Sequence, residues 1–155
     1  MRINPKDILL VSTQFLLFIV FTIDLDWSLG CSHLIKMIGL VISIFGLLIV
    51  IISILQLNKN LTPFPTPKNN SVLLQNGLYK LVRHPIYTGL IYLFSGYSLY
   101  QDSLYKLIIS FFLVILFHYK TRYEERLLQK KFSEYNLYKS KTGKFFPKFN
   151  LTFKQ

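Results

Sequence analysis

The chain has 155 residues, the length of one domain, but 52% of them are hydrophobic and only 16% are charged, which excludes an ordinary soluble composition. The net charge of +11 is carried by residues that flank apolar runs, so membrane topology and anionic headgroups explain it and nucleic acid is excluded as a partner. Cys31 is the single cysteine, so no disulfide forms within the chain, and the three scattered histidines predict no metal site.

The first two predicted elements are membrane-spanning helices. Residues 8–23 carry no charge and are short for a hydrocarbon core of ~30 Å, but the flanking Asp7 and Asp24 can sit at its two interfaces. Residues 37–57 form the longest uncharged run in the sequence and the clearest predicted span.

A row of small residues marks one face of the second predicted helix. Gly39, Ser43 and Gly46 follow one another at helical spacing. Such a row favours close contact with another helix. The alternative is that the small residues are merely tolerated there.

A connector follows, over residues 58–85. Pro63, Pro65 and Pro67 remove backbone donors and enforce an extended path, so a re-entrant or interfacial segment is expected here. Residues 71–74 are predicted to form a short strand-like piece.

Two further apolar stretches, residues 86–101 and 106–119, are separated by a polar break and predict a tight helical hairpin. The second helix is expected to continue as a basic extension to about Lys139, ahead of a tail that contains Gly143 and Pro147. The whole chain is therefore predicted to be one domain, divided into an N-terminal hairpin (1–57), the connector (58–85) and a second hairpin with its C-terminal region (86–148).

The distribution of basic residues predicts the orientation. With four spans, all of the 18 lysines and arginines except Lys36 and Lys106 fall on the side shared by the termini and the connector. The positive-inside rule then places that side in the cytoplasm.

The hairpin also predicts that two separated motifs meet. Its arms are each about 24 Å long, so the chain returns to the membrane face that it left. The segment Arg83-His84-Pro85-Ile86-Tyr87 and the pair Glu124-Glu125 are therefore expected at one rim. Ionisable groups at a membrane boundary indicate function, although snorkelling anchors and aromatic-belt residues are the structural alternatives.

Such a rim suits a zwitterionic ligand with a positive centre. A helix N-terminus offers donors to a carboxylate, a glutamate pairs with an ammonium, and aromatic faces attract a soft cation. S-adenosylmethionine has all three features.

The residues Gly77-x-Tyr79, Arg83-His84-Pro85-x-Tyr87-x-Gly89 and Glu124-Glu125, with a closing Phe146-Pro147, resemble the isoprenylcysteine carboxyl methyltransferase family, whose wider group includes bacterial relatives and phospholipid N-methyltransferases. The resemblance covers residues 58–148. It implies an all-α integral membrane protein of about four transmembrane helices, in a bacterial inner membrane, with a C-terminal helical hairpin and a cytoplasmic extension that binds S-adenosylmethionine.

The resemblance also implies roles for individual residues. The cofactor contacts would be Ser71, Val72, Leu73, Leu74, Tyr79, His84, Pro85, Ile86, Tyr87 and Glu124. A basic residue four positions before the first glutamate contacts substrate in the eukaryotic enzymes. That position is Lys120 here, with Arg122 as a substitute, and a lysine in place of arginine puts a prenylcysteine carboxylate in doubt because it cannot form a bidentate fork.

The leading hypothesis is thus a membrane methyltransferase that acts on the carboxylate, amine or thiol of a lipophilic or lipid substrate. Two alternatives remain open at this point. One is a reductase of lipid double bonds that uses a pyridine nucleotide, and the other is a non-catalytic membrane protein that keeps the same scaffold.

Overall fold

The computed structural model describes residues 4–148, and all the helices and strands assigned within that range are helices, in keeping with the predicted all-α class. There are four long helices: α1 (Pro5–Phe21), α2 (His33–Leu57), α4 (Pro85–Tyr100) and α5 (Leu104–Lys131). Three short ones complete the described structure: η1 (Asn58–Asn60), α3 (Leu78–Leu81) and α6 (Tyr135–Lys141).

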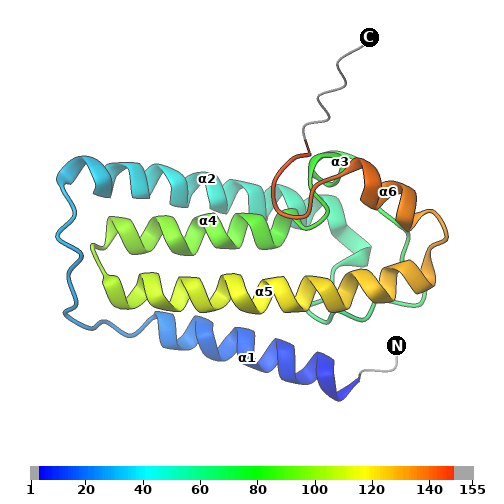
Figure 1. The fold of residues 1–155 in the computed structure, drawn as a ribbon, viewed down its shortest axis with the longest axis horizontal. Coiled ribbons are helices and arrows are strands. Elements are labelled where there is room, and N and C mark those ends of the chain that lie inside the picture. Colours follow the sequence, from blue (N-terminus) through cyan, green and yellow to red (C-terminus); the bar gives the residue numbers. More distant parts are fainter. Residues whose placement is uncertain (1–3, 149–155) are drawn as a thin grey trace, which may run out of the picture.

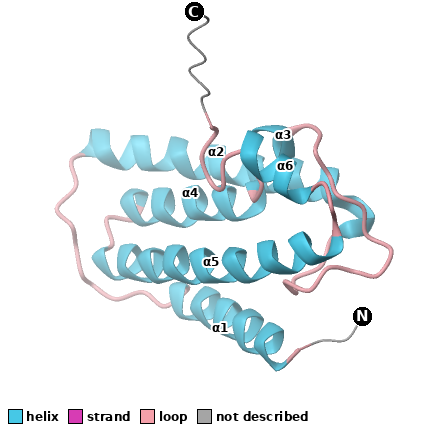
Figure 2. Cartoon of the chain, turned by 45° about the vertical axis from the view of Figure 1, so that its right-hand side comes forward, coloured by secondary structure: helices cyan, strands magenta, loops and turns pink. Residues whose placement is uncertain are grey.

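The long helices lie side by side in the order α2, α4, α5, α1 (Figure 1). The loops that join α1 to α2 and α4 to α5 share one end of this bundle, whereas the connector, α3 and α6 gather at the other end (Figures 1 and 2). The bundle therefore has a bare end and an end that carries additional structure.

Two helices, α2 and α5, are long and apolar enough to cross a membrane, judged by length and composition. Helices α1 and α4 have 17 and 16 residues, which gives lengths of about 26 and 24 Å, short of a hydrocarbon core of ~30 Å. Large apolar side chains stay exposed along the outer faces of α1 and α2. A surface of this kind is suited to lipid rather than to water.

The row of small residues predicted on α2 is confirmed as its contact face with α4. Gly39, Ser43 and Gly46 are buried there, and Ser43 Oγ donates to Leu93 O at 3.1 Å. A Cβ atom at Gly46 would lie 2.4 Å from Leu93 N and 2.6 Å from Gly89 O. The two backbones approach so closely that only glycine fits at this point.

At the bare end of the bundle, Asp102 links the loop after α4 to the loop between α1 and α2. Its carboxylate accepts hydrogen bonds from Cys31 N at 2.8 Å and Ser28 Oγ at 2.9 Å, which keep the pKa of Asp102 below its usual range, and it pairs with Lys36 at 3.2 Å. Lys106 likewise pairs with Asp24. Both cations that the sequence places at this end are thus neutralised by aspartates.

Residues 61–76 of the connector contain no helix, and residues 71–74 form no strand in the described structure, contrary to the prediction. The backbone of Val72 bonds instead to the side-chain amide of Asn60, by one bond in each direction at 3.0 and 3.3 Å. A side chain thereby takes the place that a neighbouring strand would occupy.

The prediction of a continuous helix to Lys139 was wrong. Helix α5 ends at Lys131 because Phe132 adopts extended backbone angles, and α6 begins at Tyr135. This break lets Tyr138 Oη donate to Tyr79 O at 2.6 Å, and it brings Lys139 within 2.8 Å of Glu125. A straight extension would carry both side chains away from the bundle.

The glycine contact yields a stability prediction. Replacing Gly46 with leucine should force α2 and α4 apart and lower the free energy of unfolding by about 3 kcal/mol, a cost typical of severe overpacking. Thermal unfolding in detergent micelles measures this change. Val41→Leu on the exposed face of α2 is the control and should leave the midpoint unchanged; equal midpoints for both variants would contradict the packing account.

Candidate functional site

The two motifs separated by the helical hairpin meet at the end of the bundle that carries the connector. Arg83 Nε lies 2.9 Å from Glu125 Oε1, and Tyr87 Oη donates to Glu124 Oε2 at 3.3 Å. His84 Nε2 is 3.3 Å from Glu125 Oε1. The structure therefore brings together the groups that the hairpin argument expected at one rim.

Arg83 joins this rim to the segment after α6. The Arg83 guanidinium donates to the carbonyl oxygens of Lys139 and Thr142. The backbone N–H of Arg83 donates to Gly143 O at 2.9 Å. His84 N donates to Lys144 O at 3.2 Å. The start of α4 is thus held by the backbone that follows α6.

The two glutamates have different environments. Glu125 is buried and pairs with Arg83, His84 and Lys139, so its carboxylate is occupied by structural partners. Neighbouring residues on a helix point about 100° apart, and Glu124 therefore faces another direction. Its side chain remains 26% exposed and borders two adjoining cavities.

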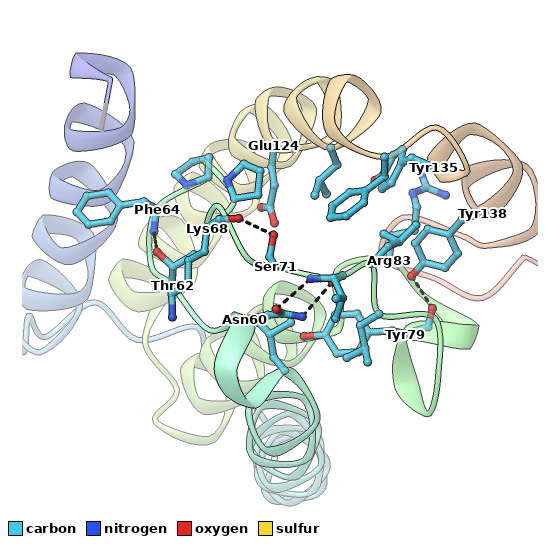
Figure 3. Close-up of a pocket in the computed structure, with 18 residues that line it drawn as sticks. Asn60, Thr62, Phe64, Lys68, Ser71, Tyr79, Arg83, Glu124, Tyr135 and Tyr138 are labelled. Atoms are coloured by element: carbon cyan, nitrogen blue, oxygen red, sulfur yellow. Dashed lines mark hydrogen bonds between the residues drawn. The ribbon is translucent and has the colours of Figure 1, made fainter. Parts of the chain in front are cut away.

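The first cavity, called cavity A, has a volume of about 100 Å³ and lies between the connector and helices α3, α5 and α6 (Figure 3). Residues Ser71, Val72, Leu73, Leu74, Tyr79 and Glu124 of the predicted cofactor set line it. Figure 3 shows the carboxylate of Glu124 pointing inward, toward the connector.

Aromatic side chains that were not among the predicted contacts complete cavity A: Phe64, Phe132, Tyr135 and Tyr138. Burial raises the pKa values of Tyr79 and Tyr135 well above their usual range, and it raises the pKa of Tyr138 to about 12. These phenols therefore stay protonated at neutral pH. Tyr135 Oη is buried without a hydrogen-bond partner in the described structure. Buried hydroxyls are usually hydrogen-bonded, so Tyr135 Oη is a candidate contact for a polar ligand atom.

The second cavity, called cavity B, has a volume of about 280 Å³. It is bordered by the other predicted cofactor residues, His84, Pro85, Ile86 and Tyr87, and by Glu124 and Tyr79, which it shares with cavity A. Much of the remaining wall is apolar: Ile54, Leu57, Leu61, Pro63 and Leu90. The predicted cofactor set is therefore divided between two adjoining spaces, with Glu124 at their junction.

The two predicted substrate residues are placed differently. Lys120 is buried in the wall of cavity B, where its ammonium donates to Gln14 Oε1 at 2.5 Å and lies 5.4 Å from the centre of the Tyr87 ring. Arg122 is about 200° farther around α5, so it is exposed and lines neither cavity. Gln14 was missed from the sequence, although an amide within an apolar run was a usable signal.

These features define the class: a membrane-associated helical protein with two adjoining cavities, each lined by polar and apolar residues, at one end of its bundle. Residues 34–135 match the family described as phospholipid methyltransferase, and the chain belongs to that family. Membership supports a membrane methyltransferase, while the narrower isoprenylcysteine resemblance stays a hypothesis. A comparison with curated proteins found no significant match.

The different roles of the glutamates can be tested through stability. Glu125→Gln should leave the buried Arg83 without its counter-ion and lower the free energy of unfolding by about 3 kcal/mol. Chemical unfolding in detergent measures the loss. Glu134→Gln removes an exposed carboxylate and serves as the control; if both variants unfold together with the wild type, the ion pair has no structural role.

Proposed function

We propose that the protein transfers a methyl group from S-adenosylmethionine to a lipophilic acceptor. The observation that carries this proposal is the position of Glu124, a partly exposed carboxylate at the junction of cavities A and B in a chain of the phospholipid methyltransferase family. The cofactor supplies a methyl group activated by its positive sulfur.

The chemistry of the lining residues fits this cofactor. The carboxylate of Glu124 suits an ammonium, and the first turn of α4, which begins at Pro85, offers backbone donors to a carboxylate. The rings of Tyr79, Phe132 and Tyr135 offer flat apolar walls to a nucleoside and faces that attract a cation. Together the two cavities reach the size range of about 300–1,000 Å³ that is usual for small-molecule sites.

Cavity B is proposed to take both the cofactor's amino-acid end, at the first turn of α4, and the acceptor, along its apolar wall. Its apolar wall suits a lipid-like chain, and the buried ammonium of Lys120 suits an anionic group, so a carboxylate is our first candidate for the methylated group. A carboxylate has no proton to lose, so His84 and Tyr87 need only orient ligands and exclude water.

A phospholipid amine is the second candidate, and the family description favours it. An amine must lose a proton before or during methyl transfer. Glu124 and His84, whose Nδ1 lies 4.0 Å from Glu124 Oε2, are the groups near enough to the junction of the cavities to accept that proton.

An assay with two probes separates the candidates. Detergent-solubilised protein is mixed with methyl-labelled S-adenosylmethionine and either a prenylcysteine or vesicles of phosphatidylethanolamine. Label in a base-labile ester supports the carboxylate, and label in the lipid headgroup supports the amine. If neither probe is labelled although the cofactor binds, a prenylcysteine and phosphatidylethanolamine are both excluded as acceptors.

We also propose four spans with both termini and the two cavities on the cytoplasmic side. Helices α1 and α4 pack against the longer α5, and aspartates neutralise both cations at the bare end. The other end keeps its excess of lysine and arginine. The positive-inside rule applies to such an asymmetry.

Cysteine labelling tests this topology. In a Cys31→Ser background, a cysteine in the 101–103 loop should react with a membrane-impermeant maleimide from outside intact cells. Gln101 is the best position there because it is exposed, whereas Ser103 is buried. A cysteine at the exposed Lys141 should react only after the cells are opened, and the reverse pattern would invert the proposed topology.

Glu124→Gln tests the cofactor site. Loss of a charge-assisted contact should weaken binding of S-adenosylmethionine by about 1.5–3 kcal/mol, or roughly tenfold to 150-fold. Tyr87→Phe removes only a neutral hydroxyl beside Glu124 and should cost about 0.5–1.5 kcal/mol. Calorimetry on folded protein gives both values, and an affinity of Glu124→Gln within twofold of the wild type would exclude Glu124 as a cofactor ligand.

A further inference from the structure

The connector forms most of one wall of cavity A, yet residues 61–76 contain no helix or strand. No ladder of backbone hydrogen bonds holds them in place as it would in a regular element. The shape of this wall therefore depends on side chains that reach it from other parts of the molecule.

Lys131, in the last turn of α5, makes the most extensive of these contacts. Its ammonium donates to the carbonyl oxygens of Lys68 and Asn69, the latter at 2.9 Å, and to Ser71 Oγ at 2.7 Å. An ammonium has three N–H donors, and all three are used. The position at the end of α5 also suits a cation, because the C-terminus of a helix is its negative end.

The residues that Lys131 holds are part of the wall itself. Lys68 and Ser71 line cavity A, and the turn that contains them leads directly into residues 72–74, which line it too. Lys131 does not border the cavity. Its effect on a ligand must therefore pass through the position of the 68–74 backbone.

Two other contacts fasten the same wall. Thr66 Oγ1 donates to Asp7 Oδ2 on α1 at 2.5 Å, and Asn60 bonds the backbone of Val72 in both directions. These contacts fix the stretches on either side of the turn. The hydrogen bonds of Lys131 connect the turn itself to α5.

We propose that Lys131 is a positioning residue for the cofactor, holding residues 68–74 in the geometry that binds it. The proposal rests on the function proposed above. A wall that is held before binding does not have to be ordered by the ligand, so affinity is higher than for a loose wall. The conformation of the connector thus depends on a residue outside the two motifs.

The test compares Lys131→Met with Lys130→Met, which removes the neighbouring, exposed lysine of the same helix. Hydrogen exchange of the connector amides is measured without ligand, and the affinity for S-adenosylmethionine is measured by calorimetry. Lys131→Met should accelerate exchange at residues 69–74 and weaken binding about tenfold, as expected for lost charged hydrogen bonds. Lys130→Met should match the wild type in both.

Unchanged exchange in folded Lys131→Met, or faster exchange with an affinity within twofold of the wild type, would overturn the proposal. If Lys131→Met does not fold, Lys131→Gln keeps two N–H donors and should show a smaller change of the same kind, while Lys131→Arg should restore most of the affinity. If the wild type binds no S-adenosylmethionine, the proposed function fails and the cofactor role of Lys131 fails with it. The exchange data then report separately whether Lys131 fastens the connector.

Discussion

The buried ion pair between Arg83 and Glu125 is the interaction on which the candidate site depends. Removing both charges from water is costly, and the structure compensates with further partners: the carbonyls of Lys139 and Thr142 for the guanidinium, and Lys139 and His84 for the carboxylate. The pair ties the start of α4 to the end of α5 and to the segment after α6. With Glu125 held in this pair, Glu124, about 100° from it around α5, lines both cavities.

The site combines the matched family region with residues outside it. Residues 34–135 include both motifs, the connector and Lys131. Helix α1 lies outside this range but supplies Gln14 to the wall of cavity B and Asp7 to the connector. Tyr138 of α6, also outside it, lines cavity A. Helices α1 and α6 therefore shape the two cavities together with the matched region.

The long helices were predictable because uncharged runs mark them. The proximity of Tyr87 and Glu124 was predictable as well, because the hairpin argument needs only the direction and length of the two helices. The separate roles of Glu124 and Glu125 were not predictable, since two adjacent carboxylates give no indication of which one faces inward. The break at Phe132 was missed because it depends on tertiary contacts of Tyr138 and Lys139 rather than on a proline or glycine. The contact between Gln14 and Lys120 joins residues far apart in the chain, and no local pattern reports it.

The central claim is that the cavities around Glu124 bind S-adenosylmethionine, and calorimetry on the detergent-solubilised protein tests it most directly. Titration with S-adenosylmethionine should give saturable binding of one molecule per chain, and NADPH, the cofactor expected of a lipid reductase, should give none. Binding of NADPH in place of S-adenosylmethionine would contradict the account and favour a reductase. Binding of neither by folded protein would contradict it as well and favour a non-catalytic role.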